Sequence, residues 1–402
     1  MDKKYYQKLL TKIITQNAKR EIKPKCKHFK ECGGCDYQNY THQDQINAKR
    51  KIFEIMTKKF KLHELFENQT MQTIQSSKEY EYRQRMDYVC AFGKTGLRKK
   101  EKYDEIINLE ECQITPKKSF KAYEETTKLA KTKKLEFYNY KEHQGYLRYI
   151  SVRQTTKNQT MIIIVTKNEE HEQKIEEIAK HLLKNKYCES IHWTIQNGKA
   201  DTSLGIPHKH WGKKEIQEEI LNKKFLIGPN TFFQSNQETA EKAFKKIKEY
   251  KNKNNCKKIL DLYSGTGVIG IATSDTKDQI TSIDNSQENQ KIATKNIKLN
   301  KIKNIKYQKQ DAKEFLKQNQ ENYDLIIIDP PRAGLGQKNT VRIMLAEPKH
   351  IAYMSCNPIT LLEDLKILKQ KYKIQKSYII DMFPQTKHLE TLILMKKITN
   401  TP

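Results

Sequence analysis

The strongest constraint on the fold is a regular alternation of short apolar segments with amphipathic ones in the C-terminal part of the chain. Segments 258–262, 279–283, 324–328 and 350–354 have the length and apolar character of buried strands, and 286–300 and 359–372 have helical spacing. This alternation predicts an α/β fold with a doubly wound parallel sheet. Two further strands, 378–383 and 391–395, have no helix between them, so we expect a closing antiparallel pair.

The preceding part of the chain predicts an accessory domain. Strand-like segments Tyr149–Arg153, Met161–Val165 and Ser190–Ile195 alternate with helical ones such as 169–185, a pattern that indicates an α+β domain. With 402 residues the chain is too long for one ordinary core. We expect a basic lead-in with helical apolar spacing at 1–25, a cysteine-marked region at 26–112, a central α+β accessory domain at 113–230 and a second, α/β domain at 231–402.

The segment from Ile259 to Gly270 passes from a strand into a helix through three glycines, Gly265-x-Gly267-x-x-Gly270. This triplet also fits dinucleotide enzymes, so an NAD-dependent dehydrogenase is an alternative. Three carboxylates favour S-adenosylmethionine (SAM). Asp261, within the strand, is placed to receive the ammonium of a methionine moiety and would repel a pyrophosphate. Asp284 ends the next strand, where it can accept ribose hydroxyls, and Asp329-Pro-Pro-Arg ends the fourth strand, where methyltransferases carry their target-side motif.

Cys356 and Glu390 are the candidate catalytic residues. Cys356 directly follows the strand 350–354, at the edge of the sheet where such folds bind ligands. A thiolate that attacks C6 of a uracil makes C5 nucleophilic, and a base must then remove the C5 proton. Glu390, in His388-Leu-Glu390-Thr, lies just before the last strand at the same edge. The alternatives are a buried filler thiol and a solvated surface carboxylate, and His388 either orients Glu390 or packs.

Three clustered cysteines, Cys26, Cys32 and Cys35, and a distant Cys112 suggest a metal centre. Thiolates with this spacing bind zinc or an iron–sulfur cluster, and the spacing leaves both open. Gly33 and Gly34 allow a tight loop with N–H contacts to sulfur.

Charge and hydropathy narrow the class of protein. The formal net charge is +28, which favours a polyanionic partner such as nucleic acid, although 67 of the 76 basic residues are Lys and part of the surplus reflects composition bias. The sequence has no apolar run long enough to span a membrane and no export signal at its start. We therefore expect a cytoplasmic protein with reduced thiols, and no obligatory protein partner is evident.

Taken together, the motifs resemble those of the uracil-C5 RNA methyltransferase family, which includes the tRNA uracil-54 enzyme and the 23S rRNA uridine methyltransferases. The matching segments are 26–38, 82–86, 232–236, 261–267, 329–334, 355–358 and 388–391. The resemblance implies SAM as methyl donor, Cys356 as nucleophile and Glu390 as base. It implies SAM contacts by Gln234, Tyr263, Asp284, Asp311 and Asp329, and a [4Fe–4S] cluster on Cys26, Cys32, Cys35 and Cys112.

The resemblance favours 23S rRNA as substrate, because this chain has the cluster cysteines and the bacterial tRNA enzyme usually lacks them. The alternative substrate is tRNA. The small β-barrel that usually begins one rRNA enzyme is expected to be absent, since only 25 residues precede Cys26. Val268 stands where many members have Asn, which puts one SAM contact in doubt. An RNA cytosine-C5 methyltransferase would place Cys after the Pro-Pro turn, where this chain has Arg332. A non-catalytic RNA-binding factor would not need Cys356, Glu390 and the glycine loop together.

Overall fold

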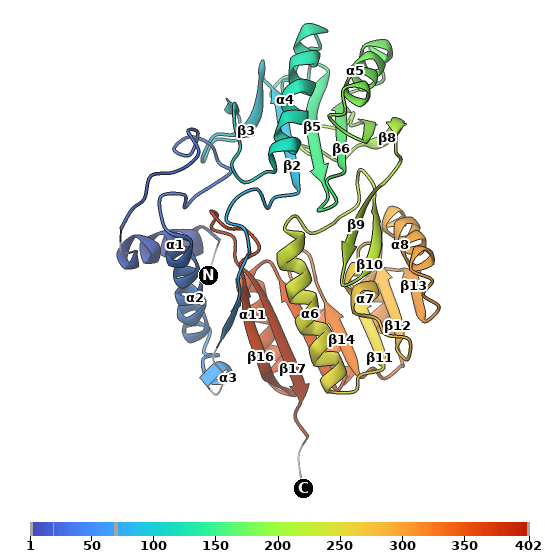
Figure 1. Ribbon diagram of the computed structural model, residues 1–402. Helices are drawn as coiled ribbons and strands as arrows, with labels where there is room; N and C mark the ends of the chain where they lie inside the picture. The colour runs from blue at the N-terminus through green and yellow to red at the C-terminus, as the bar shows by residue number, and fades with distance from the viewer. Residues whose placement is uncertain (1–2, 19, 68–70, 400–402) are drawn as a thin grey trace.

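The computed structural model describes residues 3–18, 20–67 and 71–399, and most of them belong to two bodies (Figure 1). The lower body in Figure 1 is built on an eight-stranded sheet and the upper body on a seven-stranded one.

The eight-stranded sheet confirms the expected doubly wound topology. Its order is β1-β16-β17-β15-β14-β11-β12-β13, and all neighbours are parallel except those of β17, which is antiparallel to both β15 and β16. The strands are β1 (Gln72–Ile74), β11 (Lys258–Leu262), β12 (Gln279–Asp284), β13 (Ile305–Lys309), β14 (Leu325–Ile328), β15 (His350–Ser355), β16 (Tyr372–Ile380) and β17 (Glu390–Lys397).

One predicted boundary is wrong. Helix α11 (Pro358–Leu368) ends four residues before the expected end at 372, and Tyr372 already begins β16, which we expected to start at 378. The cause is alternation: Tyr372 and Ile374 are buried and Lys373 is exposed, which is the two-residue period of a strand.

Helices cover both faces of this sheet. They are α6 (Gln237–Lys253), α7 (Val268–Thr273), α8 (Gln287–Leu299), α9 (Ala312–Gln318), α10 (Gln337–Leu345) and α11. In Figure 1, α6 and α7 lie in front of the strands. Phe244 of α6 belongs to the same apolar cluster as Ile327 of the sheet, and so does Phe225 of the hairpin formed by β9 (Ile216–Ile220) and β10 (Lys223–Ile227).

The N-terminal segment completes the opposite face. Helices α1 (Lys3–Asn17) and α2 (His42–Lys59) put Leu10 and Phe53 into one apolar cluster with Tyr353 of β15, and a short helix α3 (Glu64–Glu67) follows. We did not predict α2, although Thr41 caps it by accepting from the Asp44 N–H, a signal that the sequence carries. Strand β1 then pairs with β16, so the start of the chain is built into the C-terminal sheet.

The upper body has the α+β character that we expected of the central region. Its sheet has the order β4-β3-β2-β5-β6-β7-β8 and runs across the expected boundary between residues 112 and 113. The strands are β2 (Arg85–Ala91), β3 (Lys94–Arg98), β4 (Ile106–Asn108), β5 (Leu147–Gln154), β6 (Thr160–Thr166), β7 (Ser190–Ile195) and β8 (Ile206–Gly212), and the helices are α4 (Lys117–Thr132) and α5 (Glu172–Lys184). Buried Trp193 and the stacked pair Tyr88 and Tyr123 lie in its core.

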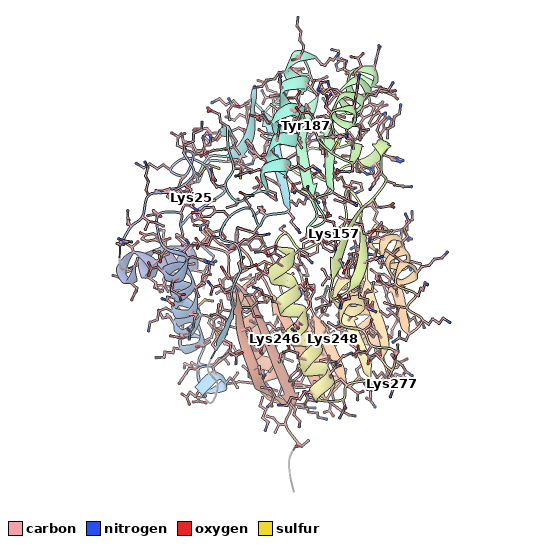
Figure 2. The ribbon with its side chains drawn as sticks, viewed as in Figure 1. Lys25, Lys157, Tyr187, Lys246, Lys248 and Lys277 are labelled. Atoms are coloured by element: carbon pink, nitrogen blue, oxygen red, sulfur yellow. The ribbon has the colours of Figure 1, made fainter. Side chains whose placement is uncertain are left out.

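Lysines are spread over both bodies. Figure 2 labels Lys157 near the seam between them and Lys246 and Lys248 on α6, and these three pair with Glu219, Glu249 and Asp275. The surplus charge is therefore partly compensated locally. Across 3–18, 20–67 and 71–399, none of the helices combines the length and the apolar character needed to cross a membrane.

Candidate active site

A cavity of about 650 Å³ lies at the carboxyl ends of β11, β12, β14 and β15. It is lined by all seven residues predicted for catalysis or SAM contact, which are Gln234, Tyr263, Asp284, Asp311, Asp329, Cys356 and Glu390. The parallel strands bring these side chains together because their carboxyl ends meet at one edge of the sheet. The volume is within the range of small-molecule sites in proteins.

The glycine loop forms one wall of the cavity. Gly265 and Gly267 have φ of +55° and +75°, a backbone conformation that glycine adopts without strain. The N–H of Gly270 donates to Asp261 Oδ2 at 3.1 Å, and a Cβ on Gly270 would lie 2.8 Å from that oxygen. Asp261 is thus buried under the loop and is not among the residues that line the cavity, so its contact with the ammonium of the methionine moiety stays a prediction.

Asp284 is held in a fixed orientation at the end of β12. Its Oδ2 accepts from the Gly265 N–H at 3.0 Å, and its Oδ1 accepts from the Ser286 N–H at 2.9 Å and from Asn289 Nδ2 at 3.0 Å. Asp311 caps α9, where its side chain accepts from the Lys313 N–H. Both carboxylates face the cavity in a defined geometry, as recognition of hydroxyl and amino groups requires.

Asp329 follows β14 and lies close enough to Cys356 and Glu390 to raise the pKa of both groups. Burial raises the pKa of Asp329 to about 6. Gln234, from the loop before α6, has its Nε2 3.4 Å from Asp329 Oδ2. A buried carboxyl of this kind is suited to bind a cationic or hydrogen-bonding ligand, which would compensate its lost hydration.

Cys356 follows β15 directly and is half-buried in the cavity wall. The next residue, Asn357, caps α11 and also donates from Nδ2 to the Arg332 carbonyl at 2.9 Å, which fixes the turn that carries the thiol. Burial raises the pKa of Cys356 to about 11, with further increases from Glu390 and Asp329 and an opposing effect of Arg332. Burial therefore favours the neutral thiol over the thiolate in the empty cavity.

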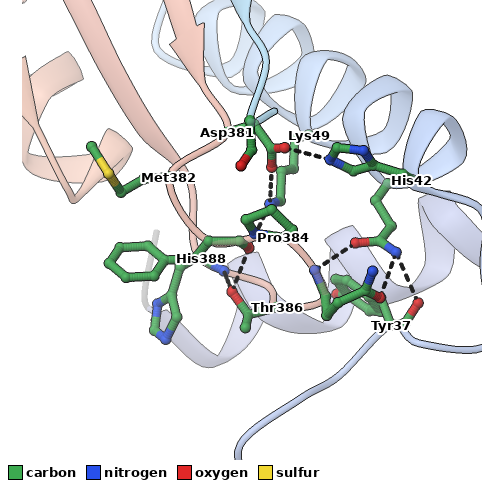
Figure 3. A network of polar contacts seen from close by, with 12 residues as sticks. Tyr37, His42, Lys49, Asp381, Met382, Pro384, Thr386 and His388 are labelled. Atoms are coloured by element: carbon green, nitrogen blue, oxygen red, sulfur yellow. Dashed lines mark hydrogen bonds and ion pairs between the residues drawn. The ribbon is translucent and has the colours of Figure 1, made fainter. Parts of the chain in front are cut away.

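Glu390 is the first residue of β17 and is 8 % exposed. Burial raises its pKa to about 8, Asp329 adds to the shift, and Arg332 and Lys49 oppose it. Once ionised, a carboxylate with so high a pKa is a stronger base than that of an ordinary Glu. The solvated-carboxylate alternative thus does not describe this residue. His388 packs its ring edge-on against Phe383, with centroids 5.7 Å apart (Figure 3).

Several lining residues escaped the sequence analysis. Asn285, Asn289 and Phe383 line the cavity, and the sequence gives no periodic or motif signal for them. Phe232 and Arg332 stood in matched segments without an assigned role. Phe232 also lines the cavity and is 62 % exposed, so an aromatic ring stands uncovered at this site.

The four predicted cysteine ligands lie near one another beside β3. The loop that carries them is bound to that strand through the Gly33 N–H, which donates to the Arg98 carbonyl at 2.8 Å. The Gly34 N–H lies 3.4 Å from the sulfur of Cys32. Burial raises the pKa of Cys32 to about 11, and the nearby Cys112 and Cys26 raise it further. Within the described residues, however, no group of three or more His, Cys, Asp or Glu side chains is arranged to hold a metal ion.

Comparison with known proteins identifies the family. The profile of the tRNA (Uracil-5-)-methyltransferase family matches residues 41–398. An uncharacterized RNA methyltransferase of Caldanaerobacter subterraneus subsp. tengcongensis is 30 % identical over 96 % of this chain and 87 % of its own length. The tRNA (uracil(54)-C(5))-methyltransferase of Pyrococcus abyssi is 30 % identical over 94 % of this chain and 87 % of its own.

The fold agrees with the sequence match. The crystal structure of the Pyrococcus abyssi tRNA (uracil-54, C5)-methyltransferase in complex with S-adenosyl-L-homocysteine superimposes with a TM-score of 0.75 and 28 % identity, covering 90 % of this chain and 86 % of that one. The glycine loop, the oriented carboxylates and the match along nearly the whole chain all lead to one assignment. The chain belongs to the tRNA (Uracil-5-)-methyltransferase family and is a SAM-dependent RNA uracil-C5 methyltransferase.

Proposed function

We propose that this enzyme methylates uracil C5 through a covalent bond between Cys356 and C6 of the base, and that Glu390 removes the C5 proton. One observation carries the proposal: the thiol, the buried carboxyl and the oriented carboxylates Asp284 and Asp311 line the same cavity. A nucleophile and a base separated from the cofactor residues would not serve this reaction.

The residues have complementary tasks. The Cys356 thiolate bonds to C6, and the electrons of the C5–C6 double bond move toward O4, which makes C5 nucleophilic. When bound, SAM supplies the methyl group that C5 takes. Glu390 then accepts the C5 proton, the double bond re-forms, and the C6–S bond breaks to release Cys356 as a thiolate. The same two residues thus begin and end the reaction.

The cavity fits SAM. Asp284 and Asp311 are anchored by backbone N–H groups and present oxygens toward the cavity. We propose Asp284 for the ribose hydroxyls, and Asp311, Gln234, Tyr263 and Asp329 as further contacts. Asp329, whose pKa is raised to about 6 by burial, would be favoured as the carboxylate next to a sulfonium cation.

We propose tRNA, at the position corresponding to uracil 54, as the substrate. The relatives named for that reaction match nearly the whole chain, including the Pyrococcus abyssi and Pyrococcus furiosus enzymes at 30 % and 29 % identity. This support favours the tRNA alternative over the 23S rRNA that the cysteines suggested. The seven-stranded upper body, in which Arg85 begins β2 and Arg83 lies two residues before it, is the proposed RNA-binding part.

Methylation assays with defined RNAs test the substrate. We expect a tRNA transcript to gain one 5-methyluridine at position 54, and a matched transcript with cytidine there to gain none. Mapping of 5-methyluridine in tRNA and 23S rRNA from a strain that lacks the gene gives the same answer in the cell. Loss from 23S rRNA alone would overturn the tRNA proposal and leave the chemistry intact.

We also propose that Cys26, Cys32, Cys35 and Cys112 hold a [4Fe–4S] cluster. Each thiolate of such a cluster binds a different iron, so its ligands lie farther apart than those of a single ion, and N–H groups such as that of Gly34 stabilise the sulfurs. Anaerobically purified protein is expected to be brown with about four irons per chain. Cys35→Ser should lose iron, whereas Cys188→Ser, in the core of the upper body, should keep it. A colourless protein with one zinc would contradict the proposal.

A further inference from the structure

The segment 381–389, here named the base loop, joins β16 to β17 and ends directly before Glu390. The backbone of Glu390 is placed by this loop on one side and by the pairing of Glu390 with Ile380 of β16 on the other. Phe383 of this loop also lines the active-site cavity. The loop has no regular secondary structure of its own, so other parts of the chain must hold it.

Helix α2 supplies one set of contacts through the buried side chain of Gln45. Figure 3 labels His42 and Lys49 of the same helix beside the base loop. Gln45 and Gln385 form a reciprocal pair: Gln45 Nε2 donates to Gln385 Oε1 at 2.9 Å, and the Gln385 N–H donates to Gln45 Oε1 at 2.8 Å. Both side chains are 1 % exposed. Gln45 Nε2 also reaches the carbonyls of Tyr37 and Tyr40, which holds its amide in one orientation.

One turn further along α2, Lys49 holds the beginning of the base loop. Its ammonium donates to Asp381 Oδ1 and to the Phe383 carbonyl, each at 3.1 Å. The other oxygen of Asp381 contacts His42 Nε2 at 2.5 Å. Lys49 is 1 % exposed and Asp381 is fully buried, so the ion pair is shielded from solvent.

The middle of the base loop is also held by the segment that precedes α2 and by Tyr82. The N–H groups of Asp36 and Tyr37 donate to the Gln385 carbonyl at 2.8 and 3.0 Å, and the Tyr82 hydroxyl donates to the Pro384 carbonyl at 2.8 Å. Asp36 follows Cys35 directly. The contacts made by α2, by Asp36 and Tyr37, and by Tyr82 together hold the backbone of the base loop from Phe383 to Gln385.

We infer that Gln45 and Lys49 are positioning residues for the proton-removal step, because they hold the base loop so that Glu390 faces the C5 atom of a substrate bound to Cys356. The inference rests on the proposed role of Glu390. Proton transfer requires the base within hydrogen-bond reach of the proton, so a displacement of about 1 Å costs on the order of 100-fold in rate. Cys356 lies in the turn between β15 and α11, whereas the contacts of Gln45 and Lys49 described above are with Asp381, Phe383 and Gln385, so we expect its attack on C6 to be unaffected.

Single-turnover assays separate the two steps. Gln45→Leu and Lys49→Met are followed by rapid quench with RNA substrate and labelled SAM, with the covalent protein–RNA adduct read on a denaturing gel. We expect adduct formation and SAM affinity to stay within about twofold and adduct decay to slow by tenfold or more, so that the adduct accumulates. Lys49→Arg, which keeps the cation and its donors, should restore much of the decay rate.

Matched controls lie on the same helix. Gln43→Leu and Lys51→Met change the same residue types at exposed positions and should leave both steps unchanged. Tyr82→Phe removes a single hydrogen bond to the base loop and provides a mild perturbation if Lys49→Met fails to fold. We expect it to slow adduct decay without affecting adduct formation.

The outcomes distinguish this inference from the proposed function. If Glu390→Gln does not trap an adduct, the role of Glu390 is wrong and the inference falls with it. If Glu390→Gln traps the adduct while Gln45→Leu, Lys49→Met and Tyr82→Phe leave its decay unchanged, only the inference is overturned. Equal slowing of formation and decay would mean that α2 acts on stability alone and would also overturn it.

Discussion

The high pKa of Glu390 predicts a specific pH dependence for the release of product. Burial is the main cause of the rise to about 8; Asp329 adds to it, and Arg332 and Lys49 oppose it. The interval from the ordinary 4.5 to about 8 corresponds to about 5 kcal/mol of preference for the neutral carboxyl in the folded protein. Since the base must be the carboxylate, adduct decay should be slow in acid and become faster as the pH rises toward 8.

The magnitude follows from the ionised fraction. With a pKa of about 8, Glu390 is ionised in roughly one molecule in 100 at pH 6 and in about half of the molecules at pH 8. Adduct decay should therefore accelerate roughly 50-fold between these values and level off above pH 9. SAM loses its positive charge when it transfers the methyl group. During decay of the adduct, no sulfonium cation is therefore present in the cavity to lower the pKa of Glu390.

A pH-jump assay measures this step alone. Adduct is formed at one pH, excess unlabelled RNA is added, and the decay is followed after a jump to pH values between 6 and 9.5. Glu390→Gln is the control and should show negligible decay at every pH. Decay that does not change between pH 6 and 8, or that keeps its pH dependence in Glu390→Gln, would refute the assignment of Glu390 as the base.

Further predictions concern single residues. Cys356→Ala should abolish methyl transfer while calorimetry still detects SAM binding; remaining turnover would contradict a covalent mechanism. Because the folded-state pKa of Glu390 is raised, its contribution to stability is complete below pH 4.5 and is lost as the pH rises through about 8, so Glu390→Gln should flatten urea-unfolding stability over this range. Asp381→Asn leaves Lys49 buried without its counter-charge and should cost about 3–5 kcal/mol near neutral pH; a loss below 1 kcal/mol would contradict a buried ion pair. Cys35→Ser should lower the melting temperature and the RNA affinity while the SAM affinity stays largely unchanged. An equal loss of SAM affinity would contradict the view that the cysteines and the SAM-binding cavity are independent sites.

Local patterns predicted much of the C-terminal sheet and its site. The strands end where apolar runs end, so Asp284, Asp329 and Cys356 reach the same edge of the sheet, and their place in one cavity follows from the parallel topology. The sequence also predicted the glycine loop, because Gly265 and Gly267 adopt positive φ values that few other residues tolerate. These features depend on neighbours close in the chain.

The sequence was a poorer guide where a side chain has two plausible environments. Asp261 occupies the strand position expected for a ligand contact, yet its carboxylate turns under the loop and accepts from Gly270. A strand residue faces one side or the other, and only the packing of α7 against β11 decides which. The raised pKa of Glu390 also depends on tertiary packing. Burial of its carboxyl is the main cause, and the sequence pattern around Glu390 does not show which distant elements bury it.

The sequence by itself determined the order of strands and helices in the catalytic part, the cofactor class and the reactive residue types. The tertiary structure alone decided that β1 joins this sheet beside β16, and that helix α2 reaches the loop before Glu390. Gln45 and Gln385 are 340 residues apart in the chain, and Lys49 is one of many lysines. Short-range periodicity specifies local elements, whereas contacts over such separations form only when the apolar faces of distant elements pack together.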